Sequence, residues 1–211
     1  MRPQWDHNSN ILAKSKKNPQ ILSIWKVSED DVTLQEDLGE KEHEDQIWDI
    51  SLSPDKKILV VGFGMESVTI WNYQTMEKII DRRGCSYVQL TNSSFQTAFS
   101  KDSSLFAVKT AQGIIVYKSL DQEMLGVFPY KDHIFSVSIS EDNSKIAIGL
   151  KDKAFVHEIQ SKEVLAELEC SSYDTNSNVY VQTKWIGSKS LFGRWKKDVR
   201  VWQMQNKSAS K

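Results

Sequence analysis

An aromatic position that recurs at nearly constant spacing is the feature that most constrains the fold of this chain. It ends a short, mostly apolar and β-branched segment, and it returns after 46, 46, 40 and 45 residues, at Trp25, Trp71, Tyr117, His157 (where histidine replaces the aromatic) and Trp202. This spacing is close to the ~40–45 residues of one four-stranded antiparallel repeat. The recurrence therefore predicts an all-β chain in which these five residues are structural anchors.

A polar turn keeps step with the aromatic position. It follows the first strand of a repeat as Ser53-Pro54-Asp55, Ser100-Lys101-Asp102 and Ser140-Glu141-Asp142, and less clearly as Ile186-Gly187-Ser188. Proline presets φ for the second place of a turn, and Ser and Asp side chains bond to nearby backbone amides. Two markers with the same period indicate a true internal repeat.

The repeats are expected at about 1–38, 43–82, 90–128, 130–168 and 179–205, within one segment over 1–207 that is followed by a disordered tail, 206–211. The second repeat is the fullest, with strands expected at 47–52, 58–61, 67–72 and 77–81. The first repeat lacks most of its opening strand, and the last lacks its fourth. An unpaired sheet edge is an aggregation hazard, so we expect another chain, or the rest of a larger protein, to complete this one.

These residues resemble the WD40 repeat family over nearly the whole chain. The family pattern can be laid without gaps on 43–72, where Trp71 holds the tryptophan place and Asn72 the aspartate place. The hydrogen-bonded side-chain set of the family is incomplete in this chain. Its places fall on His43, Val61, Met65 and Trp71 in the second repeat and on Tyr130, Ile148, Asp152 and His157 in the fourth.

The resemblance implies a β-propeller of WD40 type with four-stranded antiparallel blades and an incomplete or open ring. It also implies a non-catalytic scaffold or adaptor that mediates protein–protein interactions within a larger complex. Family propellers usually have more than five blades, which agrees with a chain that needs completion. The paired-arginine motif of lipid-binding relatives is absent.

Composition excludes several classes of function. With 27 basic and 28 acidic residues the net charge is -1, so no attraction to nucleic acid or anionic membranes is expected. There is no apolar run near the ~20 residues that span a bilayer, and no signal-peptide pattern, so we expect an intracellular protein, cytoplasmic or nuclear. Cys85 and Cys170 have no metal-ligand spacing and are expected to be reduced thiols.

No catalytic constellation is recognisable in the sequence. None of the four histidines (His7, His43, His133 and His157) has a Cys, Asp or Glu partner at zinc-site spacing. Nucleophile elbows, phosphate-cradling glycine loops and paired catalytic carboxylates are missing too. We therefore expect a protein that is not an enzyme and uses neither metal nor cofactor.

Candidate binding residues lie in the connections between strands. Two basic clusters fall in the second-to-third-strand connections of the first and last repeats: Lys14, Lys16 and Lys17, and Arg194, Lys196 and Lys197. In the family these loops share one face, so ring closure would make the clusters neighbours and form a patch for an acidic or phosphorylated peptide or another phosphate-bearing ligand. The alternative is that they are simply solvated loops. Trp48 and Trp195 are either partner contacts or residues packed between sheets.

Overall fold

The computed structural model describes residues 4–5, 10–14, 22–27, 31–38, 47–63, 68–82, 97–110, 113–169, 181–195 and 198–204. The chain divides into two compact units, Met1–Thr97 and Ala98–Lys211.

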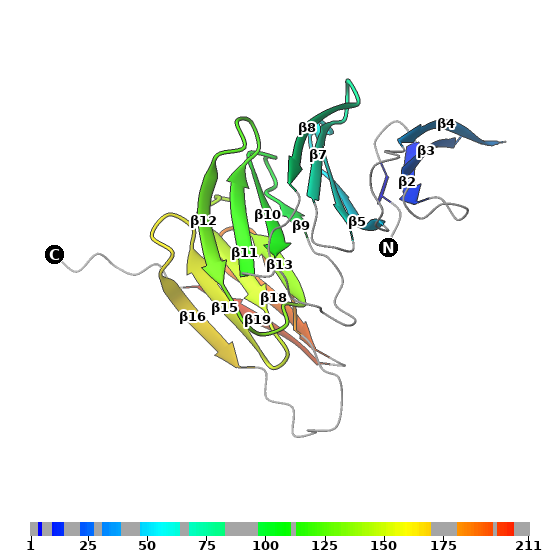
Figure 1. The fold of residues 1–211 in the computed structure, drawn as a ribbon. Helices are drawn as coiled ribbons and strands as arrows, with labels where there is room; N and C mark the ends of the chain where they lie inside the picture. The colour runs from blue at the N-terminus through cyan, green and yellow to red at the C-terminus, as the bar shows by residue number, and fades with distance from the viewer. Residues whose placement is uncertain are drawn as a thin grey trace. The chain divides into compact units, whose positions relative to one another are not determined.

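The first unit consists of two four-stranded antiparallel sheets (Figure 1). In each sheet the strands follow one another in chain order. One sheet contains β1 (Gln4–Trp5), β2 (Asn10–Lys14), β3 (Leu22–Val27) and β4 (Val32–Leu38). The other contains β5 (Ile47–Leu52), β6 (Ile58–Phe63), β7 (Val68–Asn72) and β8 (Glu77–Arg82).

The second unit contains three antiparallel sheets, the last of them three-stranded over the described residues. The first sheet contains β9 (Thr97–Phe99), β10 (Leu105–Thr110), β11 (Gly113–Lys118) and β12 (Met124–Pro129). The next contains β13 (Ser136–Ile139), β14 (Lys145–Gly149), β15 (Lys153–Glu158) and β16 (Val164–Glu169). The last contains β17 (Gln182–Ile186), β18 (Ser190–Trp195) and β19 (Asp198–Gln203).

The prediction of an all-β chain with four-stranded antiparallel sheets is confirmed, and the part of the chain that the structure describes contains no helix. Local patterns located the strands well, because short β-branched runs were bounded by turn residues. The strand expected at 58–61 extends to Phe63, and the one expected at 77–81 extends to Arg82. The predicted tail, 206–211, lies outside the described residues.

In the second unit the sheets are stacked in layers, and the middle sheet, β13–β16, has a core on each face. Towards β9–β12, Ile146 and Ile148 pack with Ala107 and Val116. On the opposite face, Ala147 and Val156 pack with Trp185 and Leu191 of the last sheet. Strands buried on both faces read as continuous apolar runs, which is why 146–148 shows no polar alternation.

Over the described residues of the first unit, a core lies between its two sheets. Leu22 of β3 packs against β5–β8, where Ile47, Ile50, Leu59 and Val61 are buried. Val61 occupies one of the polar places of the family pattern, so at this place the core contains an aliphatic side chain where the pattern has a hydrogen-bonded hydroxyl.

One irregularity recurs in the four sheets that have a fourth strand. The pairing between the third and fourth strands shifts register immediately before the anchor residue, at Trp25, Trp71, Tyr117 and His157. In β11–β12, for example, Val116 pairs with Gly126 but Tyr117 pairs with Met124, which leaves Leu125 as an extra residue. A bulge of this kind increases the local twist of the strands. The anchors therefore share a backbone environment as well as a sequence position.

Candidate functional site

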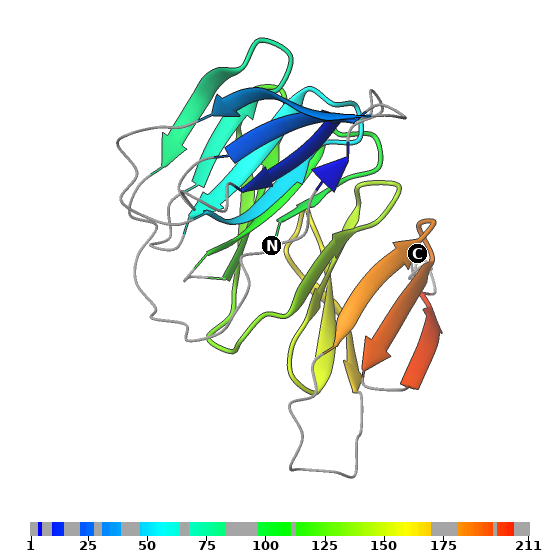
Figure 2. The same ribbon diagram turned by 90° about the vertical axis from the view of Figure 1, so that its right-hand side faces the viewer.

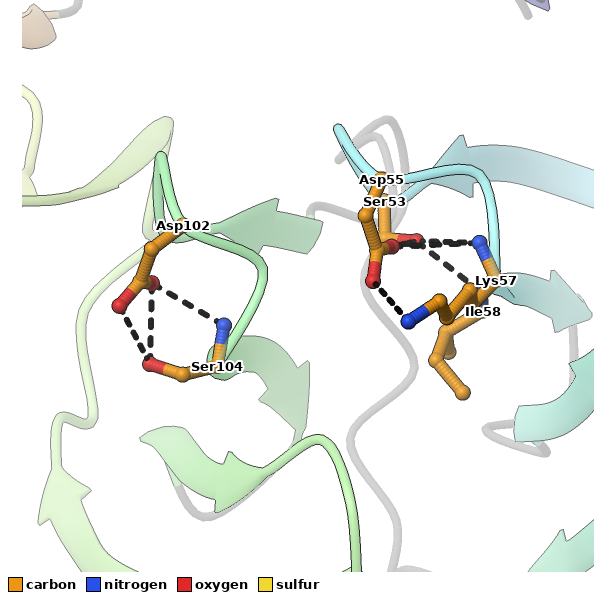
Figure 3. Close-up of polar contacts among 6 residues, drawn as sticks. All are labelled: Ser53, Asp55, Lys57, Ile58, Asp102 and Ser104. Atoms are coloured by element: carbon orange, nitrogen blue, oxygen red, sulfur yellow. Dashed lines mark hydrogen bonds and ion pairs between the residues drawn. The ribbon is translucent and has the colours of Figure 1, made fainter.

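The Ser-x-Asp turns are built alike in three sheets. The buried Ser53 hydroxyl donates to Asp55 at 2.6 Å and accepts from the backbone N–H of Ile58 at 2.9 Å, as drawn in Figure 3. The Ser100 and Ser140 hydroxyls make the corresponding pair of bonds, at 2.6–2.7 Å to the carboxylate and 2.9 Å from the amide. In each turn the fourth residue has φ near +60°, at Lys56, Ser103 and Asn143. The polar side chains of these turns thus bond to their own backbone.

In the second unit two of these turns also bond to each other. The Asn143 side-chain amide donates to Asp102 at 2.7 Å and to the Ser104 hydroxyl at 2.8 Å, and Lys101 pairs with Glu141 at 3.0 Å. Figure 3 shows the Asp102 carboxylate directed at Ser104. Burial raises the pKa of Asp102, but hydrogen bonds from Ser100, Ser104 and Asn143 outweigh burial and lower it to about 2. This network fixes two layers together and leaves the carboxylate ionised.

A buried histidine and a half-buried tyrosine stand at two of the places that the family pattern assigns in the fourth predicted repeat. Nδ1 of His157 lies 3.2 Å from the carbonyl oxygen of Lys162 and donates to it, so Nε2 accepts from the Tyr130 hydroxyl at 2.5 Å. Phe128 and Phe155 pack around the imidazole. Burial lowers the pKa of His157, and it also raises that of Tyr130, with help from the charge of Glu167. The pair is neutral and structural near pH 7.

In the second repeat the anchor makes a different bond. The indole N–H of Trp71 donates to the hydroxyl of the buried Thr69 at 2.9 Å, two residues earlier on the same strand face. Asn72, in the aspartate place, accepts from the backbone N–H of Gln74 at 2.9 Å and of Thr75 at 3.2 Å. The sequence analysis did not identify Thr69 as the partner of Trp71. The pattern that could have indicated it is the spacing of two residues, which puts both side chains on the same face of a strand.

A buried lysine links two layers of the second unit. The ammonium of Lys109, on β10, donates to the carbonyl oxygen of Ile134 at 2.9 Å. Burial lowers the pKa of this group to about 8. An ammonium taken from water is costly without hydrogen-bond partners, so this bond compensates part of the cost of burying it.

The last sheet has one buried face and one exposed face. In β17, Thr183 and Trp185 are buried while Gln182, Lys184 and Ile186 are exposed. The strand registers extend this alternation across the sheet, because Lys184 pairs with Phe192 and Phe192 with Val201. We call the exposed side the open face; its residues are Gln182, Lys184, Ile186, Ser190, Phe192, Arg194, Val199, Val201 and Gln203.

Apolar residues occupy four of the nine positions of the open face, with Phe192 on the central strand and the other three on the flanking strands. Ile186, Val199 and Val201 are 55%, 54% and 53% exposed, and Phe192 between the outer strands is half-buried. Lys184 and Arg194 supply two positive charges, and none of the nine residues is acidic. Figure 2 shows this sheet, orange to red, beside the yellow sheet of the same unit. Exposed apolar side chains gathered on one sheet face are typical of protein-binding surfaces.

The structure locates only part of the predicted binding set. Arg194 is an exposed residue of β18, and Trp195 ends that strand. Lys14 ends β2 in the other unit, so the two basic clusters belong to different units. Lys16, Lys17, Lys196 and Lys197 lie outside the described residues. The joint basic patch therefore remains a prediction.

Trp48 has an unusual backbone position. Ile47 pairs with Phe63 and Asp49 with Gly62, so Trp48 is the unpaired extra residue of a bulge in β5. Bulges redirect side chains and are frequent near functional sites. The open face, in contrast, was not anticipated as a whole, although the alternation of Gln182, Lys184 and Ile186 with buried residues was visible in the sequence.

Comparison with protein-family models gave no match, and comparison with curated protein sequences gave none either. Over the described ranges, no three His, Cys, Asp or Glu side chains are grouped so that they could hold a metal ion. A helix of the length and apolar character needed to cross a membrane is likewise not found in the part of the chain that was searched.

Proposed function

We propose that this chain is a non-catalytic scaffold of the WD40 β-propeller type, which binds protein partners within a larger complex. The observation that carries the proposal is the open face of β17–β19, where three aliphatic side chains on the flanking strands are more than half exposed. Stacked sheets of the same build hold this surface in place. The side chains of the recurring Ser-x-Asp turns bond to the backbone of their own turns, so these positions stabilise the sheets and are not available as a chemical site.

Quantitative affinity purification tests the scaffold proposal. The full chain, carrying a tag, is expressed in cells of its source and recovered beside a tag-only control, and co-purified proteins are measured by mass spectrometry. We expect one or more partners in near-stoichiometric amount. These complexes should persist when salt is added, because salt screens interactions between charges but not the burial of apolar surface. Recovery of the chain alone would overturn the proposal.

A second candidate function is recognition of an acidic or phosphorylated peptide by the basic residues Lys14, Lys16, Lys17, Arg194, Lys196 and Lys197. The exposure of Arg194, with the exposed Lys184 on the same face, favours it. Reversing all six charges should reduce binding of a polyphosphorylated peptide at least tenfold while leaving partners of the apolar surface in place. Unchanged peptide binding would exclude this function.

A further inference from the structure

The turn that follows the anchor is built alike in three sheets, between β7 and β8, between β11 and β12, and between β15 and β16. Two residues after the anchor, a backbone N–H donates at 2.8 Å to the Ser-x-Asp turn of the same sheet, from Tyr73, Ser119 and Ile159. Three residues later the backbone is left-handed, at Met76, Gln122 and Lys162. The three turns therefore place equivalent residues in equivalent positions.

In two of these turns an apolar residue is buried and its neighbour is polar and exposed. Tyr73 and Ile159 are buried, and each belongs to a hydrophobic core of its unit. The residues that follow them, Gln74 and Gln160, are exposed. The sheet that carries Gln160 has a core on each of its faces. Packing on both faces of a sheet thus leaves this position of the turn open to solvent.

In the turn between β11 and β12 this order is reversed (Figure 1). Ser119 takes the buried position, and its hydroxyl has no hydrogen-bond partner among the described residues. Leu120 takes the exposed position and is 96% exposed. A buried hydroxyl without a partner destabilises the fold, and a leucine left in water forgoes the gain of burial. The needs of folding therefore do not explain this pair.

Hydrogen bonds hold Leu120 at the tip of a fixed turn. The side-chain amide of Gln122 donates to the carbonyl oxygen of Ser119 at 2.6 Å. At the base of the turn the backbone N–H of Lys118 donates to the carbonyl oxygen of Glu123 at 2.9 Å, and the two side chains form an ion pair. A contact residue that is already held in place loses less entropy when a partner binds it.

We propose that Leu120 is a docking residue, which a protein partner buries in an apolar pocket. The charges of the turn narrow the chemistry of that partner. Asp121 is exposed beside Leu120, whereas Lys118 and Glu123 pair with each other. The tip is therefore negative, and a complementary pocket carries Lys or Arg at its rim. The same charge repels anionic lipid headgroups, so we assign the occupant to protein. This inference rests on the proposed scaffold function and gives it a second contact.

Two exposed aliphatic residues provide a matched test. The tagged full chain is prepared as wild type, as Leu120→Gln, which copies the glutamine of the other turns, and as Val164→Gln, at a valine that is 53% exposed. The partners recovered by wild type are quantified for each variant. We expect Leu120→Gln to lose at least about tenfold of a partner, as for a central interface residue, and Val164→Gln to retain it. Equal recovery by the two variants would overturn the inference.

The variant Asp121→Asn tests the charged rim. Oδ1 of Asp121 accepts the backbone N–H of Glu123 at 3.1 Å, and asparagine keeps this acceptor while it removes the charge. We expect partner recovery to fall severalfold and to depend less on salt than it does for wild type. Unchanged recovery with unchanged salt dependence would contradict a cationic rim.

A cross-link identifies the occupant directly. Photo-reactive benzoylphenylalanine is placed at position 120 and, as a control, at position 160 of the equivalent turn. Position 120 should cross-link to an apolar segment of another protein that is flanked by Lys or Arg, and position 160 should not. A cross-link from 120 to a second copy of this chain contradicts the proposed occupant. So does sedimentation with phosphatidylserine vesicles that is lost in Leu120→Gln.

Thermal melts separate a loss of binding from a loss of folding. Leu120→Gln changes a side chain in solvent, so its Tm should stay within about 2 °C of wild type. Ser119→Ala removes a buried hydroxyl that lacks a partner, so a fall in its Tm of more than about 2 °C would refute the argument from the reversed pair. If every variant retains the partners that wild type binds, only this inference fails, whereas absence of any partner refutes the scaffold function as well.

Discussion

A single buried hydroxyl organises each of the three Ser-x-Asp turns. Ser53, Ser100 and Ser140 are fully buried, and each both donates to a carboxylate and accepts from an amide. A turn of this kind carries positive φ at a non-glycine residue, which costs of order 1–3 kcal/mol. The hydroxyl bonds offset that cost locally, so the turn does not depend on glycine.

Removing one of these hydroxyls should destabilise the second unit. Ser140→Ala leaves the buried amide of Lys145 without its 2.9 Å acceptor and Asp142 without its 2.6 Å donor. We expect a loss of about 1–2 kcal/mol in the free energy of unfolding, measured by urea denaturation. Ser161→Ala, at an exposed turn, is the control and should cost less than about 0.5 kcal/mol. Equal losses in the two variants would show that the turn hydroxyl has no special role.

Lys109 should give the chain a pH-dependent stability. Its pKa is about 8 in the fold and near 10.5 when unfolded, so between these values the unfolded chain binds more protons and stability rises with pH. In Lys109→Met this contribution is absent. The stability of the variant relative to wild type should therefore fall by about 2 kcal/mol from pH 7.5 to pH 10.5, after allowance for solvent screening.

Parallel stability curves for Lys109→Met and wild type would contradict this prediction. The exposed Lys131 offers a matched control in the same unit. Lys131→Met should follow the wild-type curve over the whole range. The measurement is chemical denaturation at several pH values with ionic strength held constant.

At the scale of elements, the anchor residue Trp202 couples its strand to the preceding sheet. The ring of Trp202 lies over Gly193, where an added Cβ would come within 2.2 Å of it. The same ring packs against the buried cluster of Ala154 and Val181. Glycine at 193 thus lets the tryptophan fill the space between two layers.

Gly193→Ala should displace Trp202 and weaken the attachment of the last sheet. We expect a loss of about 1–3 kcal/mol, the usual cost of overpacking, together with a change in tryptophan fluorescence. Gly126→Ala is the matched control, because its Cβ would meet only the flexible end of Lys162, at 2.7 Å. That variant should be close to neutral. A stable Gly193→Ala protein with unaltered fluorescence would refute the packing argument.

For the molecule as a whole, the last described sheet differs from the others in its third strand. Over the described residues β19 pairs only with β18, whereas the third strand of every other sheet pairs on both sides. The backbone groups of an edge strand are a template for association. The open face beside this edge adds exposed apolar area.

The isolated chain should therefore associate without forming a defined dimer. We expect light scattering to show polydisperse species that grow with concentration, because the edge of β19 is a template for strand pairing between copies. A stable monomer with a single cooperative melt would contradict the prediction.

Much of the architecture was predictable because its causes are local. Turn chemistry at Ser53-Pro54-Asp55 and short β-branched runs such as 58–61 decide where strands begin and end, and their recurrence gives the number of sheets. The register shifts were not predictable. The extra residue Leu125 continues an apolar run, and its displacement appears only when β11 and β12 are paired.

The sequence by itself determined the strands, the turns and the repeat, because these depend on residues a few positions apart. Only the tertiary structure decided which side of each strand is covered, since that depends on a neighbouring layer about 45 residues away in the chain. Val156 and Val201 have the same local pattern, yet one is fully buried and the other is 53% exposed. The physical reason is that the next layer of the second unit stacks on Val156, whereas Val201 belongs to the last described sheet of that unit.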